Sequence, residues 1–175
     1  EFAATLYGVL PFTAEKFFGN PERCLIDWDD TKDSSNYGHV FLFFRYLVTH
    51  YARTEPERQK LVRALVASRR TSVSGVEEAM QQCQIPMTIA DVFRNFCAAT
   101  YLNKAIDDGL GSTFAFDGFV EKGLAAVKKN PVLPLQTLSL PASRFKGKVK
   151  MWSSQAFAFR LKQKTKAISI DFVGD

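Results

Sequence analysis

The sequence predicts an α+β protein: a helical subdomain of about four helices, then a connector and a short antiparallel β segment. Between residues 34 and 103, apolar residues recur at intervals of three and four, as on one face of a helix. Helix-capping patterns are dense in the same region. From residue 144 onward, basic and apolar residues alternate, which is the period of a half-buried strand.

Two long helices are expected first, after a loop-rich opening segment. Ser34, Ser35 or Asn36 can cap a helix that ends near Tyr51. Its apolar positions repeat at three and four: Val40, Phe41, Phe44, Leu47, Val48 and Tyr51. The capping box Thr54-Glu55-Pro56-Glu57, with proline in the first turn, predicts the next helix.

Two further helices complete the predicted helical subdomain. Ser74-Gly75-Val76-Glu77 fits a capping box and predicts a short helix to about Met80. Thr88-Ile89-Ala90-Asp91 starts a fourth helix, whose apolar side chains gather on one face. Short loops join these helices, so we expect them to pack closely.

The chain divides into three parts on this interpretation: a helical domain at 1–108, a connector at 109–143 and the start of a β-rich domain at 144–175. The connector contains Gly and Pro at intervals and one short helix near 117–127. Strands are expected at 144–151, 157–161 and 168–172, with a hairpin turn at 162–165. Three strands make an incomplete sheet, which indicates a β-rich domain cut short.

The net charge of +5 lies in the C-terminal part of the chain. Residues 1–140 hold 15 basic and 16 acidic residues, whereas residues 141–170 hold eight basic residues and no acid. Lysines interleaved with aromatic residues could indicate a nucleic-acid surface. In the alternating register, however, the aromatic side chains point away from the lysines, so we favour a solvated sheet edge.

The two histidines, His39 and His50, are the first candidates for chemistry. Eleven residues of helix place them roughly 16 Å apart along the axis, too far to bind one metal ion. We therefore interpret both as packing or surface residues. The acidic stretch 27–33 lacks the spacing of an EF-hand loop, and we interpret it as a solvated loop before a helix.

Other signals narrow the function further. The chain has no apolar run long enough to cross a membrane and no signal-peptide pattern at its start, so it does not indicate a compartment directly. The three cysteines are too few and too scattered for a disulfide framework. A single Cys83–Cys97 bridge stays an alternative if the protein is exported. Cys97 fits a buried small hydrophobe. Nucleotide-binding and serine-hydrolase motifs are missing.

Four stretches in this order resemble one protein family: "EFAATLYG", "FFGNPERCLIDWDD…SSNYGHVFLFFRYLVTHY", "LVRALVASRRTSVSGVEEAM" and "VFRNFCAATYL". The pattern is similar to the region after the zinc motif in secreted bacterial metallopeptidases of the gluzincin type, such as the hyicolysin-like and immune-inhibitor-A-like enzymes. The family's Trp matches Trp28, its YG matches Tyr37-Gly38, and its helix start matches Gly75-Val76-Glu77. The resemblance covers residues 1–103, and the ending of the chain resembles, more weakly, the first strands of the β-domain that follows in such proteins.

This resemblance implies a C-terminal fragment of a zinc-dependent endopeptidase, secreted or periplasmic, that acts on protein or peptide substrates and is inactive alone. Glu1 matches the end of the family's third-ligand motif, so the zinc ligands and the general base would lie before this chain. The resemblance offers one catalytic candidate, Tyr37, as an oxyanion stabiliser, although its motif is Y-G and not the Y-x-x-G of related aminopeptidases. The alternative role of Tyr37 is packing at a helix start. The alternative function is a non-enzymatic helical/β module whose basic sheet face binds protein, glycan or nucleic acid.

Overall fold

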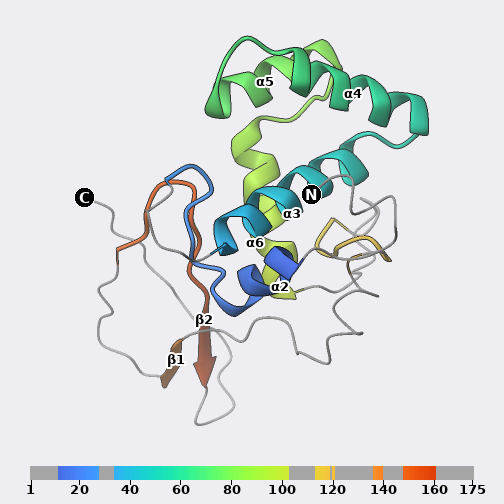
Figure 1. Cartoon of the computed structure of the whole chain (residues 1–175). Helices are drawn as coiled ribbons and strands as arrows, with labels where there is room; N and C mark the ends of the chain where they lie inside the picture. Colours follow the sequence, from blue (N-terminus) through green and yellow to red (C-terminus); the bar gives the residue numbers. More distant parts are fainter. Residues whose placement is uncertain are drawn as a thin grey trace.

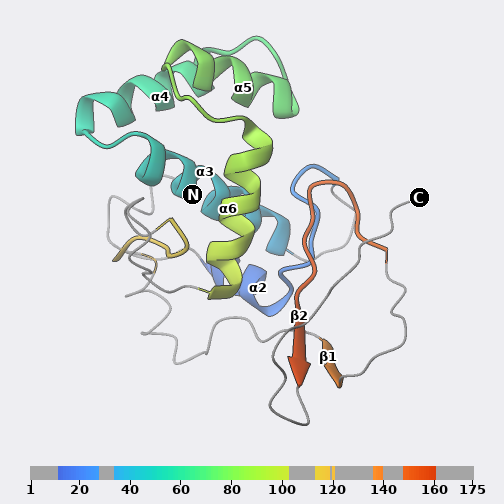
Figure 2. The same cartoon turned by 180° about the vertical axis from the view of Figure 1, so that it is seen from behind.

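The computed structural model describes residues 12–27, 34–102, 113–118, 120, 136–139 and 148–160. This part of the chain is mostly helical, with a minimal β component (Figures 1 and 2). Its elements are α2 (Phe12–Gly19), α3 (Ser35–Tyr51), α4 (Glu55–Ala67), α5 (Ser72–Gln82), α6 (Ile89–Leu102), β1 (Gln136–Ser139) and β2 (Phe157–Arg160).

Helices α3 and α6 form the centre of the molecule, and α2 packs against α3 (Figure 1). The antiparallel pair α4 and α5 lies at one end, and both views place the two strands at the other end (Figure 2). The core is rich in aromatic side chains from the three central helices. The α4–α5 pair contributes Leu61, Ala64, Val76, Ala79 and Met80 to the same hydrophobic core.

Two of the predicted helix starts are confirmed in atomic detail. At α4, the Glu57 N–H donates to Thr54 Oγ1 at 3.4 Å, and the Thr54 N–H donates to Glu57 Oε2 at 2.9 Å, which completes the capping box. At α6, the Asp91 N–H donates to Thr88 Oγ1 at 3.1 Å. Hydrogen bonds from Thr54 and Thr88 lower the pKa of the Glu57 and Asp91 carboxyl groups, because they stabilise the charged forms.

The capping box predicted at Ser74 is wrong. Helix α5 already begins at Ser72, with Thr71 as its N-cap, so Ser74 lies inside the helix. The Ser74 hydroxyl donates to the Thr71 carbonyl oxygen at 2.9 Å and is thus engaged one turn back. The predicted number of about four helices is also too low, because α2 forms within the segment expected to be loop.

The strand expectations need larger corrections. The only strand pair in the described residues is parallel and not antiparallel, with Gln136 opposite Phe157 and Ser139 opposite Arg160. Strand β1 falls inside the predicted connector, and β2 matches the strand predicted at 157–161.

No strand forms at residues 148–151, within the first strand expected at 144–151. Met151 and Trp152 form a turn, in which the Ser153 N–H donates to the Lys150 carbonyl oxygen at 3.1 Å. Trp152 has a φ of 58°, which is incompatible with a strand. The turn and strand predicted at 162–165 and 168–172 lie outside the described residues, and the division into domains stays a prediction.

A close backbone approach joins α2 to α3 at Gly38. A Cβ atom at this position would lie 1.9 Å from the Thr13 carbonyl oxygen and 2.8 Å from the Ala14 nitrogen. Only glycine permits this distance, because the neighbouring atoms belong to backbone and not to a side chain that can turn away.

We expect Gly38→Ala to lower the free energy of unfolding by about 3 kcal/mol, because the two helices must separate to admit the methyl group. Gly19→Ala is the matched control, since a Cβ there would meet nothing within 4 Å. Urea unfolding followed by circular dichroism measures both variants. Equal stability of the two variants would show that α2 does not pack on Gly38.

Candidate functional site

The first turn of α3 presents Tyr37, the candidate from the family resemblance, to the surface. Its side chain is 53% exposed, whereas Asn36, Gly38 and His39 beside it are buried. Gly38 fixes this turn against α2, so the tyrosine lies on a rigid helix and not on a loop. The geometry gives Tyr37 access to a ligand, and its catalytic role stays a prediction.

His39 lies inside the aromatic core and not in a polar site. Its ring stacks on Phe17 at a centroid distance of 4.5 Å and on Phe96 at 5.5 Å, with interplanar angles of 23° and 18°. The residue is 2% exposed. Burial lowers the pKa of His39 from 6.5 to about 3, and a hydrogen bond to the Arg23 backbone opposes this shift only in part.

His50 is held by its own helix at the opposite end of α3. Its ring stacks on Tyr46 at 4.1 Å, and its Nδ1 lies 3.1 Å from the Tyr46 carbonyl oxygen and 3.2 Å from Thr49 Oγ1. The structure therefore gives the two histidines separate surroundings. Across the described ranges, no three His, Cys, Asp or Glu side chains are grouped so that they could hold a metal ion.

Side chains of α3 form hydrogen bonds with the segment at 113–120, a contact that the sequence did not reveal. Arg45 forms a bidentate ion pair with the Asp117 carboxylate: Nε donates to Oδ1 at 3.1 Å, and Nη2 donates to Oδ2. The Tyr46 hydroxyl donates to the Thr113 carbonyl oxygen at 2.5 Å. Asp117 also accepts the Val120 N–H at 3.2 Å, as a helix N-cap does. This cap agrees with the short helix expected near 117, but nothing in the sequence pairs Asp117 with Arg45.

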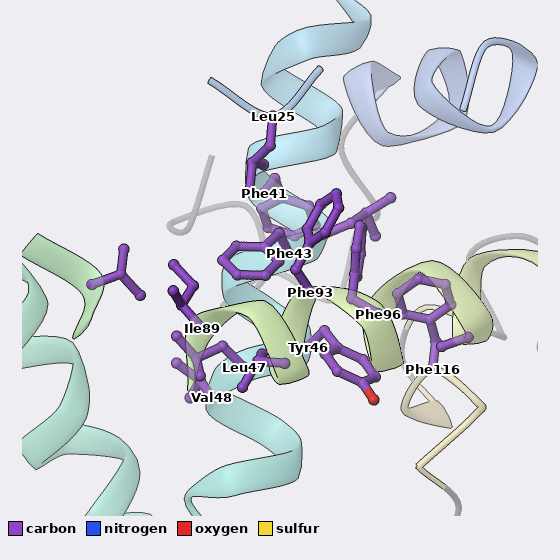
Figure 3. Packing of buried hydrophobic residues seen from close by; sticks show 14 of the residues in the cluster. Leu25, Phe41, Phe43, Tyr46, Leu47, Val48, Ile89, Phe93, Phe96 and Phe116 are labelled. Atoms are coloured by element: carbon purple, nitrogen blue, oxygen red, sulfur yellow. The ribbon is translucent and has the colours of Figure 1, made fainter. Parts of the chain in front are cut away.

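Figure 3 shows how the apolar side chains of this region meet. Phe43 and Tyr46 of α3 point toward Phe93 and Phe96 of α6, and Phe116 packs at the end of this row. Ring centroids lie 5.5 Å apart for Phe43 and Phe96 and 6.0 Å apart for Phe96 and Phe116. The stripe of Phe residues is thus core packing and not a ligand pocket.

Residues 148–155 run along residues 22–27, in a contact that the sequence also did not reveal. The Leu25 N–H donates to the Trp152 carbonyl oxygen at 2.8 Å, and Lys150 Nζ lies 2.9 Å from Asp27 Oδ2. These pairs, 25 with 152 and 27 with 150, define an antiparallel course. The Trp152 ring packs edge-on against Phe93 at 5.3 Å.

Asp27 is the only described member of the acidic stretch 27–33, since residues 28–33 lie outside the described ranges. It pairs with a lysine and lies in no metal-binding group of the described residues.

Several buried side-chain atoms lack hydrogen-bond partners among the described residues. They are Glu22 Oε1, Asn36 Oδ1, His39 Nδ1 and Gln155 Oε1. Glu22 and Gln155 belong to the two segments that run side by side, and His39 forms a hydrogen bond with the backbone of Arg23, next to Glu22. Buried acceptors without donors reduce stability by about 1–3 kcal/mol each.

All three cysteines are free, so the Cys83–Cys97 bridge that the sequence left open is not formed. Cys24 lies in the contact between residues 22–27 and 148–155: its Sγ donates to the Met151 carbonyl oxygen at 3.0 Å and accepts the Asp27 N–H at 3.2 Å. Burial raises the pKa of the Cys97 thiol to about 11, despite a hydrogen bond with Ser154. Cys97 packs against the core but is only partly buried, whereas the sequence predicted a buried residue, and its raised pKa makes it a poor nucleophile.

Comparisons with known proteins give no family for this chain. No protein-family model matches it, and neither the curated proteins nor the solved structures contain a significant match. Among the helices that the structure describes, none is both long and apolar enough to span a membrane.

We expect iodoacetamide to modify Cys97 about a hundredfold more slowly in the native protein than in urea, because the thiolate is the reactive form. Mass spectrometry of the alkylated peptides measures the rate at pH 8, and the same cysteine in the unfolded chain is the control. Equal rates in the two states would contradict the buried, protonated thiol. Resistance to alkylation in urea until a reductant is added would instead reveal a disulfide.

Proposed function

We propose that this chain is the C-terminal, helical part of the catalytic domain of a secreted or periplasmic zinc-dependent endopeptidase. The sequence resemblance suggests the class of enzyme. The observation that supports it is the exposed phenol of Tyr37 on a turn whose other side chains are buried.

The surroundings of Tyr37 suit a residue that must be held in place. Gly38 lies against the Thr13 backbone, and the His39 ring stacks on Phe17 and Phe96, so both neighbours of Tyr37 are packed in the core. A hydroxyl on such a support can donate a hydrogen bond to the oxyanion that develops when a peptide bond is attacked. Catalysis benefits because the donor needs no rearrangement during the reaction.

The described residues do not fit a zinc site. His39 is enclosed by aromatic rings, His50 contacts its own helix, and no group of three candidate ligands exists in the described ranges. On our proposal, the metal ligands and the general base belong to another part of the same polypeptide. This remainder of the protein would be the partner of the helical part, and a protein or peptide would be the substrate.

The alternative, a module that binds through a basic sheet face, receives less support. It requires Lys148 and Lys150 to stand in a row on a strand. In the structure, residues 148–150 have no regular structure, and Lys150 pairs with Asp27. The basic residues beyond position 160 lie outside the described part of the chain.

The polypeptide that precedes Glu1 tests the proposal directly. We expect the gene to encode H-E-x-x-H and a third ligand motif shortly before Glu1, because zinc hydrolysis needs three protein ligands and a base. A reading frame without this motif would reject the peptidase assignment. Steeply salt-dependent binding of the purified chain to polynucleotides would favour the basic module instead.

In the complete enzyme, we expect Tyr37→Phe to lower kcat for casein peptides by about 10- to 100-fold and to leave KM nearly unchanged, because the lost hydrogen bond forms in the transition state. Tyr51→Phe is the matched control, since the Tyr51 hydroxyl accepts a hydrogen bond from Asn95 at 3.0 Å inside the helical part. Unchanged turnover of the Tyr37→Phe enzyme would assign Tyr37 to packing alone.

A further inference from the structure

A buried histidine occupies the point where four parts of the chain meet. His39 belongs to α3, contacts Phe17 of α2 and Phe96 of α6, and forms a hydrogen bond with the backbone of Arg23. It is 98% buried. Its ring therefore joins α2 and residues 20–27 to the two central helices.

The surroundings accept only the neutral ring. One hydrogen bond, to the Arg23 backbone, satisfies the ring in part, and Nδ1 has no partner among the described residues. A second proton would place an N–H without an acceptor and a full charge between two Phe faces. We propose that His39 is an acid-sensitive latch, and that its protonation releases α2 and residues 20–27 from α3 and α6.

No neighbouring carboxylate among the described residues offsets the positive charge of a protonated His39 ring. The ionisable side chains on α3 and on the parts packed against it are Glu15, Lys16, Glu22, Arg23, Cys24, Asp27, Tyr37, Arg45, Tyr46, His50, Tyr51, Glu55, Glu57, Arg58, Lys60, Arg63, Asp91, Arg94, Cys97, Tyr101 and Asp117. Asp27 and Asp91 are paired with Lys150 and Arg94. Of the remaining acids, Glu22 is next to Arg23, yet no carboxylate in the described residues contributes to the pKa of His39. Burial is the main cause of its shift.

Release of α2 and residues 20–27 would also change the contacts of the segment at 148–155. Phe93 lies 6.3 Å from the His39 ring and 5.3 Å from the Trp152 ring, so it contacts both. Residues 22–27 also hold this segment through the Leu25–Trp152 hydrogen bond and the Asp27–Lys150 pair. Trp152 fluorescence should therefore report the state of the latch.

The sign of the effect follows from proton binding. The folded state lowers the pKa of His39 from 6.5 to about 3, so the unfolded state binds the proton more strongly. The stabilisation is complete above pH 6.5 and is lost as pH falls from 6.5 toward 3. Between pH 7 and pH 5, this group alone should raise the unfolding equilibrium constant roughly 25-fold.

Urea unfolding at pH 7 and pH 5 tests the latch, because ordinary carboxyl groups, with a pKa of about 4, change little in this window. Trp28→Phe leaves Trp152 as the single tryptophan reporter. We expect His39→Phe, which keeps an aromatic ring but cannot take a proton, to lose the 25-fold pH effect, and His50→Gln to retain it. Equal pH dependence of the wild-type and His39→Phe proteins would overturn the proposal, as would loss of the effect in His50→Gln.

If His39→Phe does not fold, NMR of the wild-type protein with labelled histidine decides the question, since the chain has two histidines that the His50→Gln variant distinguishes. A His39 ring that stays neutral in the folded protein until the Trp152 signal changes supports the latch. A ring that titrates near pH 6.5 without any change in that signal refutes it.

Discussion

The packing of the three central helices, α2, α3 and α6, depends on the aromatic cluster around Phe96. Its ring lies within 6.2 Å of six other aromatic rings: those of Phe17, His39, Phe43, Tyr46, Phe93 and Phe116. These rings come from α2, α3, α6 and the segment at 113–120. Because this one side chain contacts four parts of the chain, the position of each part depends on the packing of the others.

Local sequence signals predicted the helices well where a few neighbouring residues decide the structure. The capping box at Thr54 and the start at Thr88 depend on side chains three positions apart, so they are visible in the sequence. Helix α2 was missed because it has only eight residues and owes its stability to the contact with Gly38, far away in the chain. The parallel strand pair was missed for the same kind of reason, since pairing across a long connection leaves no local pattern.

The candidate site shows the same limit. The helical spacing predicted that His39 and His50 lie at opposite ends of one helix, and the structure places them there. The spacing could not reveal that the His39 ring stacks on two Phe rings, because these belong to residues 17 and 96, far away in the sequence. The pairing of Arg45 with Asp117 spans 72 positions and lies equally beyond local reasoning. Alternation at 144–151 predicted a strand, whereas the carbonyl groups of Met151 and Trp152 accept hydrogen bonds from Cys24 and Leu25, and the described backbone turns there. A tertiary contact overrode the local preference.

The first turn of α3 divides its residues between two tasks. Asn36, Gly38 and His39 are buried and position the helix, and Tyr37 alone among these four is exposed. On our proposal, Tyr37 is the residue of this turn that contacts a substrate, and its buried neighbours hold it in position. The same burial that makes this support rigid also makes it intolerant of a charge on His39.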